Sequence, residues 1–225
     1  MKKIILLILI TLNSNANSLY NLSKSLSKPL VYKGEGHMIL SDIEGGNPFI
    51  YPITIKTTFE PQKDIDKGRH LFITKEEMTS PLPDGGVYTQ KMKTSIVTDS
   101  DENILIIERI TEQDGEIDKV YCVPQSKYNR PIKDFKTIGY QESKRFYKCS
   151  DKTIQAGIRY LSGGSRTSGN LVSKNMIIVN SEEKKFYVDE ETIVNLEKDG
   201  TINYILGSSS VEGSMVTMYK LEKYE

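Results

Sequence analysis

The only two cysteines in the 225-residue chain are Cys122, in "KVYCVPQ", and Cys149, in "RFYKCSDK". Two such residues can form a disulfide, help to hold a metal or act as a reactive thiol pair. Zinc needs four ligands, and adding both histidines of the chain gives spacings that match no common zinc site. A redox pair favours C-x-x-C, which is absent. We therefore predict a structural disulfide between Cys122 and Cys149, with free thiols as the alternative.

Residues for nucleophilic or metal-assisted catalysis are scarce. The chain has two histidines, His37 and His70, and both lie in strand-like surroundings where we expect surface or strand-end side chains. There is no G-x-S-x-G elbow, no H-E-x-x-H and no Walker loop. A pair of carboxylates could still support hydrolysis, but nothing in the sequence selects a pair from 30 acidic residues. The sequence favours a non-catalytic protein and indicates no cofactor.

Two polar stretches have some features of ligand loops. "DSDENI" (Asp99–Ile104) begins like a calcium loop, but Ile104 replaces the glycine of the sixth position and Ile110 the glutamate of the twelfth. "SGGSRTSGN" (Ser162–Asn170) is rich in glycine, yet it leads into a strand-like run instead of a helix N-terminus. We interpret the first as a polar turn and the second as a hairpin loop, and we predict no metal site.

Charge is unevenly distributed along the sequence. Residues 99–126 carry eight acids and two bases, whereas residues 127–152 carry eight bases and three acids. Residues 153–180 add three bases and no acid, so the stretch 127–180 has a net charge of +8. Aromatic residues are interleaved with these bases, and basic groups beside aromatic rings suit anionic polymers or headgroups.

This stretch gives the leading functional hypothesis, a basic face that docks an anionic glycan, a lipid headgroup or an acidic protein. The alternative is that neighbouring acidic strands neutralise the bases within the fold. Nucleic acid is an unlikely partner for a protein that we expect to be exported. The residues assigned to the face are Lys127, Arg130, Lys133, Lys136, Lys144, Arg145, Lys148, Arg159, Arg166, Tyr128, Tyr140 and Tyr147.

A second hypothesis comes from the size and class of the chain. A β-barrel of this size can carry an apolar small molecule or lipid in its interior. A carrier should co-purify with its ligand, whereas a docking module should bind in a salt-dependent way without a small molecule.

Turn signals and β-rich runs define the elements that must position any site. Asp114-Gly115 and Asp199-Gly200 each separate two apolar runs, a pattern typical of tight hairpins. With a two-residue turn at Asp114-Gly115, Cys122 lies opposite Ile107. The stretch "TSPLPDGG" (Thr79–Gly86) could be a hinge, but we interpret it as a long hairpin loop.

Three runs are apolar at every position or nearly so: residues 104–107, 120–123 and 176–179. Strands with one wet face alternate instead, so we expect these three to be central strands covered on both faces. Together with the turns, they predict a mainly β fold: one antiparallel domain of about ten to twelve strands, sandwich or barrel-like. Leu19, Leu22 and Leu26 fit one face of a short N-terminal helix.

The N-terminus predicts export. Lys2 and Lys3 precede an apolar run from Ile4 to Leu12, and Ser14 and Ala16 supply the small residues of a signal-peptidase site. We expect residues 1–16 to be a signal peptide and residues 17–225 to be a single exported domain. No cysteine follows the expected cleavage site, so we expect no lipid anchor there. Periplasmic and extracellular locations both fit, and the oligomeric state is left open.

Overall fold

The computed structural model describes residues 26–40, 48–66, 68–82, 85–101, 103–125, 141–151, 154–162, 169–180, 185–197, 201–211 and 215–224. All regular secondary structure in these ranges is β-strand, and every strand pair is antiparallel, which confirms the predicted fold class. The expected signal peptide and most of the expected N-terminal helix lie outside these residues. Within this part of the chain, no helix is long and apolar enough to cross a bilayer.

The described residues form thirteen strands. They are β1 (Leu30–Leu40), β2 (Phe49–Phe59), β3 (Lys63–Asp66), β4 (Arg69–Pro81), β5 (Val87–Thr98), β6 (Ile104–Gln113), β7 (Glu116–Pro124), β8 (Gln141–Cys149), β9 (Ile154–Ser162), β10 (Gly169–Asn180), β11 (Lys185–Leu196), β12 (Ile202–Val211) and β13 (Met215–Tyr224).

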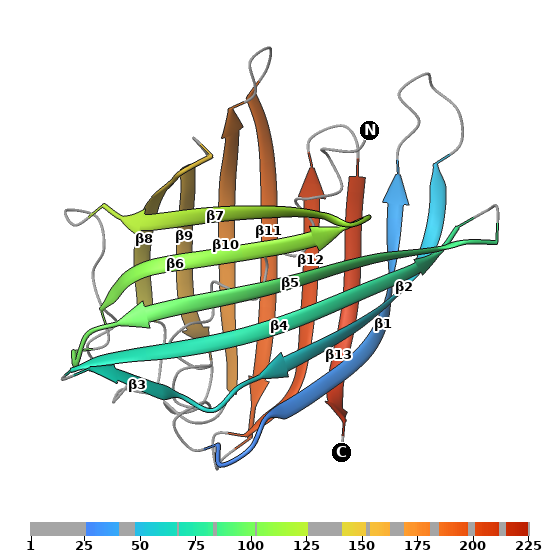
Figure 1. Cartoon of the computed structure of the whole chain (residues 1–225). Coiled ribbons are helices and arrows are strands. Elements are labelled where there is room, and N and C mark those ends of the chain that lie inside the picture. The colour runs from blue at the N-terminus through green and yellow to red at the C-terminus, as the bar shows by residue number, and fades with distance from the viewer. Residues whose placement is uncertain are drawn as a thin grey trace.

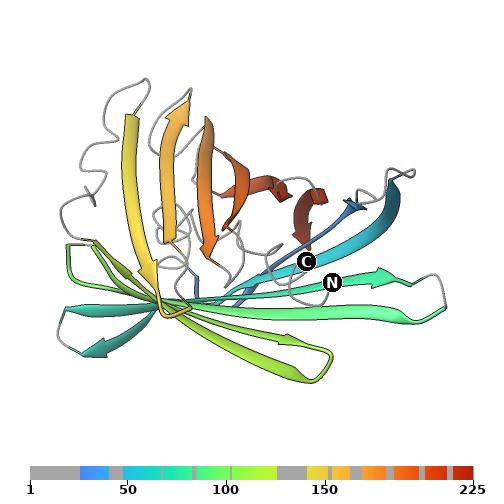
Figure 2. The same cartoon turned by 90° about the horizontal axis from the view of Figure 1, so that it is seen from above.

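One sheet contains all of these strands, in the order β2-β1-β13-β12-β11-β10-β9-β8-β7-β6-β5-β4-β3. Two groups of strands cross each other in Figure 1: β4 to β7 run across the view, in front of β8 to β13, which run upright. We call these groups the crossing layer (β4–β7) and the upright layer (β8–β13). Figure 2 shows them from above, with the crossing layer along one side of the molecule.

The two layers are joined at two seams of different length. On one side β2 pairs along its whole length with β1 and also, through residues 54–59, with β4. On the other side β7 and β8 share three register pairs, of which the first joins Cys122 and Cys149. Among the described residues these two strands share no further pair. The sheet therefore does not close into a regular barrel.

Strand alternation sends one face of each layer inward. In β13, Met215, Thr217, Tyr219 and Leu221 are buried, and the residues between them are exposed. β2 alternates in the same way. This period of two is what a sheet with one dry face requires, because successive side chains of a strand point to opposite faces.

The inward apolar side chains form two clusters. Cluster one contains buried residues from both layers and from β1 and β2: Tyr32, Met38, Ile53, Ile55, Phe59, Met78, Tyr88, Met92, Val188, Val194, Leu196, Ile202, Ile205, Val211, Met215, Tyr219 and Leu221. Cluster two lies towards the β7–β8 seam: Phe72, Ile96, Ile107, Val120, Cys122, Tyr147 and Cys149. The core is therefore the space between the crossing and the upright layers.

The expectation that three apolar runs are covered on both faces is wrong for β6 and β7. Ile107 and Val120 are buried, but Leu105, Tyr121 and Val123 are exposed. Met176 in β10 is exposed as well. No second layer covers the outer face of these strands among the described residues, so the run of apolar residues reflects composition and not burial.

The predicted hairpin at Asp114-Gly115 is confirmed. Both residues have positive φ, 51° and 79°, which a two-residue turn of this type requires and glycine adopts at little cost. The resulting register places Ile107 opposite Cys122, as expected. β4 and β5 also form a hairpin, with Pro81 opposite Val87, so the hinge interpretation of residues 79–86 is not supported.

Candidate polar site between the layers

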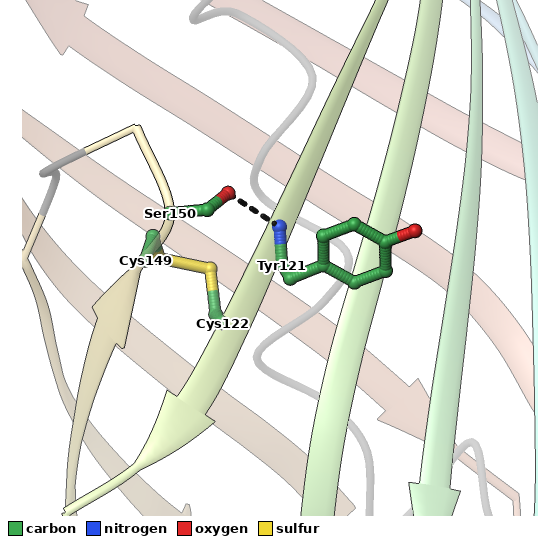
Figure 3. The surroundings of a disulfide bond; sticks show 4 residues. All are labelled: Tyr121, Cys122, Cys149 and Ser150. Carbon is green, nitrogen blue, oxygen red and sulfur yellow. Dashed lines mark hydrogen bonds between the residues drawn. A yellow bond between two sulfur atoms is a disulfide. The ribbon is translucent and has the colours of Figure 1, made fainter.

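The predicted disulfide is present. Cys122 and Cys149 are bonded with an S–S distance of 2.01 Å, and their Cα atoms lie 4.0 Å apart across the β7–β8 seam. Both side chains are buried in cluster two. Figure 3 shows the bond together with the flanking residues Tyr121 and Ser150. A buried bond inside a strand pair is structural, so these cysteines supply no reactive thiol.

Backbone contacts support the bond on both sides. The Tyr121 N–H donates to the Ser150 hydroxyl at 3.0 Å (Figure 3). The Ser150 N–H donates to the Tyr121 carbonyl at 2.8 Å. Gln125 N–H donates to the Phe146 carbonyl at 2.9 Å. The seam is thus a short ladder fastened by one covalent bond, and it holds the corner at which the two layers meet.

Polar residues interrupt the apolar interior of the crossing layer. Glu76 lies between Phe72 and Met78 of β4, and Thr94 lies between Met92 and Ile96 of β5. These neighbours belong to the two apolar clusters, so the polar residues occupy the boundary between cluster one and cluster two.

The strand register brings these polar residues into adjacent rows. Arg109 of β6 is directly opposite Thr94, and Thr57 of β2 is directly opposite Glu76. Gln90 of β5 is directly opposite Met78, and Met78 is the next inward-facing residue after Glu76 in β4. Residues directly opposite one another in an antiparallel pair point to the same face.

A matching polar row crosses the upright layer. Glu190 of β11 is opposite Ser209 of β12, which in turn is opposite Thr217 of β13. All three side chains are buried. We call the two sets together the polar band. Its members are Thr57, Glu76, Gln90, Thr94, Arg109, Thr111, Glu190, Thr192, Ser209 and Thr217.

Many atoms of the polar band are buried without a hydrogen-bond partner. Both carboxylate oxygens of Glu76 are in this state, although the residue is only 2% exposed. So are both amide atoms of Gln90 and the hydroxyls of Thr57 and Thr94. Leaving one buried polar group unsatisfied costs about 1–3 kcal/mol, so a folded protein tolerates few of them without a compensating partner.

Burial determines the protonation of Glu76. Desolvation raises the pKa of its carboxyl to about 8; the Arg109 guanidinium opposes this shift, and the Glu190 carboxylate adds to it. Near neutral pH the Glu76 carboxyl is therefore largely protonated. A neutral carboxyl in this position can donate a hydrogen bond, and an incoming positive group would convert it to the carboxylate.

Arg109 is the cation of the polar band, and its Nε and Nη2 atoms are buried without hydrogen-bond partners. Burial lowers the pKa of its guanidinium, and nearby carboxylates oppose that shift. These carboxylates come from four strands or turns and are, in decreasing order of effect, Glu190, Asp151, Glu76 and Asp118. Among the described side chains, four acids thus act electrostatically on this one guanidinium.

Two of these acids indicate where the interior meets solvent. Asp118 has the inward parity of Val120 and Cys122 in β7, yet it is exposed. Asp151, just after β8, is also exposed. Both lie near the region where β7 and β8 share no register pair beyond the disulfide. Two exposed acids on this side of the seam therefore act electrostatically on buried Arg109.

A separate hollow of about 400 Å³ lies over the outer face of β1, β11, β12 and β13. Exposed Glu35 and His37 line it together with Glu191 and Met218. It is open to solvent and shares no buried charged residue with the polar band. Within the described ranges, no group of three or more histidine, cysteine, aspartate or glutamate side chains is arranged to hold a metal ion.

Both histidines lie away from the polar band. His37 is exposed on the outer face of β1. His70 Nδ1 is 2.8 Å from the Asp64 Oδ1 atom and 2.8 Å from the Gln62 amide nitrogen. The hydrogen bond from His70 is the main reason that the pKa of Asp64 is lowered. Among the described residues, neither histidine lies beside a buried nucleophile.

The polar turn predicted at Asp99 has a clear structural basis. The Asp99 carboxylate accepts hydrogen bonds from the backbone N–H groups of Asp101 and Asn103, at 2.9 and 2.8 Å, and from the Asn103 side chain at 2.9 Å. Its oxygens therefore organise the turn that precedes β6.

The structure tests little of the predicted basic face. Lys148 is exposed, as a docking residue must be, but Tyr147 is buried in cluster two and adds no ring to an exposed surface. The backbone places Lys144 and Arg145 in β8 and Arg159 in β9, but their side chains lie outside the description. The remaining residues of the face lie outside the described residues: Lys127, Tyr128, Arg130, Lys133, Lys136, Tyr140 and Arg166.

Comparisons with protein-family models, with curated proteins and with solved structures found no match to this chain. The polar band is therefore the structural feature that bears on the function of this protein. Sequence analysis missed this band because its members are scattered from Thr57 to Thr217. A usable signal was the appearance of Glu76, Thr94 and Arg109 at positions where strand alternation demands an apolar side chain.

Proposed function

We propose that this protein is a non-catalytic binding protein that holds a small molecule between its two layers. The polar part of the ligand would meet the polar band, and its apolar part would lie against clusters one and two. The observation that carries the proposal is Glu76, a buried carboxyl with neither oxygen hydrogen-bonded. A ligand that reached it would supply the missing partner and offset the cost of its burial.

The architecture supports this proposal over docking through the basic stretch. A fold needs no row of buried acids, amides and hydroxyls for its own stability, because apolar residues of similar volume would pack at lower cost. Ligand sites, by contrast, typically combine apolar walls with a few polar groups that fix orientation. The docking hypothesis stays a prediction, since Lys148 is its only basic residue with a described side chain.

The direct test is native mass spectrometry of the full chain purified without organic solvent or detergent. We expect a species heavier than the polypeptide that loses the extra mass on denaturation. After any co-purified molecule has been removed, adding 1-hexanol, hexanoate or hexylammonium should raise the thermal unfolding temperature of the protein. A ligand at 100 times its Kd stabilises the folded state by about 2.7 kcal/mol. A native mass equal to that of the polypeptide, with no shift for any probe, would overturn the proposal.

Carboxylate-based hydrolysis is a second candidate, favoured by one specific observation. Glu190 acts electrostatically on Glu76, whose pKa is raised to about 8, as expected for one member of an acid–base pair. An enzyme of this kind should turn over a chromogenic glycoside or ester, and Glu76→Gln should abolish that turnover. Binding of an intact small molecule without turnover would favour the carrier instead.

We also infer that the protein works outside the cytosol. The disulfide fits an oxidising compartment, and the predicted signal peptide supplies a route to it. N-terminal sequencing of protein recovered from a bacterial periplasm should begin at Asn17. Recovery of reduced protein with an intact N-terminus from the cytosol only would contradict this inference.

A further inference from the structure

Among the described residues, more acids than bases act on Arg109 and Glu76. Four carboxyl groups act on this guanidinium: Glu190, Asp151, Glu76 and Asp118. Among the described residues that act on Glu76, Arg109 is the only base. A site with more acids than bases favours a ligand that brings positive charge and disfavours one that brings negative charge.

The acids are also arranged by depth. Asp118 and Asp151 are exposed, on the side of the seam where β8 ends after the disulfide, whereas Glu76 and Glu190 are buried. An approaching cation would first meet the exposed pair and then the buried pair. Exposed charges of one sign raise the local concentration of an oppositely charged ligand and its association rate.

Glu76 has the chemistry to receive such a group. Its two oxygens are buried and unpartnered. Thr57, opposite it on β2, and Gln90, one inward position along β5, also have buried polar atoms without partners. An ammonium group has three donors and no acceptor, so it can satisfy the carboxylate and adjacent side-chain oxygens together. A fatty acid headgroup would instead place a further carboxylate beside Glu76 and Glu190.

We propose that the interior site takes a small organic cation, an alkylammonium-type molecule whose N–H groups bind Glu76 and whose apolar chain packs against the clusters. This inference rests on the proposed function and specifies its ligand class. Metal ions are a poorer fit, because the described residues contain no group of three or more potential metal ligands.

Binding requires a proton to leave. The Glu76 carboxyl is largely protonated at pH 7, and a bound ammonium group favours the carboxylate, so the proton passes from the carboxyl to the solvent as the charged hydrogen bond forms. The wild-type protein should therefore release close to one proton per bound hexylammonium at pH 7, and progressively fewer above pH 8.

The experiment compares the affinities of three probes of equal chain length by isothermal titration calorimetry at pH 9, where Glu76 is already largely ionised: hexylammonium, 1-hexanol and hexanoate. We expect hexylammonium to bind about tenfold more tightly than hexanol at this pH, because a charged hydrogen bond contributes roughly 1.4 kcal/mol more than a neutral one. Hexanoate should bind most weakly. Titration of the wild-type protein at pH 7 in two buffers of different ionisation enthalpy measures the released proton.

Glu76→Gln should remove most of the preference for hexylammonium over hexanol, because it should lower hexylammonium affinity more than hexanol affinity. The matched control is Glu77→Gln, the same substitution at the adjacent, outward position of β4. It should leave all three affinities unchanged. Because the proton measurement uses wild-type protein, the test does not depend on how well Glu76→Gln folds.

The outcomes separate the two proposals. Equal or tighter binding of hexanol or hexanoate, or hexylammonium binding without proton release, would overturn the cation proposal and leave a binding protein of another specificity. Equal loss of hexylammonium affinity in Glu76→Gln and Glu77→Gln would also overturn it. Failure of all three probes, with no co-purified molecule, would overturn the proposed function itself.

Discussion

Cluster one and cluster two share the same interior but are secured in different ways. Cluster one draws side chains from both layers, next to long ladders: β1 shares eleven register pairs with β2 and ten with β13. Cluster two lies beside the three-pair ladder between β7 and β8, and two of its members are the bonded cysteines. The covalent bond is thus found at a short backbone ladder.

This difference indicates a division of roles. Long ladders with many apolar contacts stabilise the β1–β2 side through packing, whereas the β7–β8 side relies on one bond. The polar band adjoins both clusters, and its Arg109 is influenced by Asp118 of β7, on the less extensively paired side. Sites that must admit a ligand are commonly found where local stability is low.

The largest effect should come from cluster one. Phe59 is fully buried, with its ring 5.6 Å from that of Tyr32 in an edge-to-face arrangement. Phe59→Ala should lower the free energy of unfolding by about 3–5 kcal/mol, measured by urea denaturation. Phe49→Ala, which truncates an exposed ring of the same strand, should change it by less than about 0.5 kcal/mol. Equal effects of the two variants would contradict the burial of Phe59.

Removing the disulfide should have the next largest effect. The bond spans a sequence separation of 27 residues, so the Cys122→Ala/Cys149→Ala protein should lose about 3.5 kcal/mol in the chain-entropy model. Hydrogen exchange sharpens the comparison. The amides of Tyr121 and Ser150 should lose protection, while that of Tyr219 keeps it. Loss of protection at all three amides by the same factor would show that the clusters are not secured independently.

A smaller effect should follow from filling the space at Gly207. A Cβ atom there would lie 2.0 Å from the Tyr219 Cζ atom, so the ring would have to move. Gly207→Ala should cost about 1–3 kcal/mol, the usual range for overpacking. Combined with Tyr219→Leu, which shortens the clashing side chain, the substitution should cost less than it does alone. Strict additivity in this double-mutant cycle would exclude the predicted clash.

The smallest change in any single step is that of one pH unit, and it is due to Glu76. Its pKa is about 8 in the folded protein and close to 4.5 in the unfolded chain, so between these values the folded state holds a proton that the unfolded state has lost. The free energy of unfolding should therefore fall by about 1.4 kcal/mol per pH unit from about pH 5 to pH 8 and level off above.

Glu76→Gln should flatten this slope, and Glu77→Gln should preserve it. Urea denaturation at five pH values would measure both variants. A wild-type stability that rises across this window would contradict the burial of a proton-binding Glu76 carboxyl.

Local features of the fold were accessible from the sequence. The Asp114-Gly115 turn fixed the register of β6 on β7, and that register correctly placed Cys122 in a buried strand pair. The cysteine pairing followed from the number of cysteines and the expected compartment. These successes share one basis: each depends on residues close in sequence or on a choice with few alternatives.

Features set by distant strands were not accessible. Leu105, Tyr121 and Val123 look like core residues by composition, but whether a second layer covers them depends on the whole sheet. The polar band needs both registers and layers, because Glu76 and Glu190 come together only once β4 and β11 face each other. The sequence could mark Glu76 as an anomaly in its strand, but it could not identify its partners.

The pairing of β1 with β13 has a consequence for how the chain folds. Along the sheet from β4 to β13, each strand neighbours the next in sequence, so these ladders can form one after another by hairpin closure. Val31, however, pairs with Tyr224, almost the full length of the chain away. During synthesis β1 can pair with β2 but must wait for the last strand to be made before its second edge is covered. Completion of the sheet is therefore a late, non-local event, and until it occurs the edge of β1 is available to other chains.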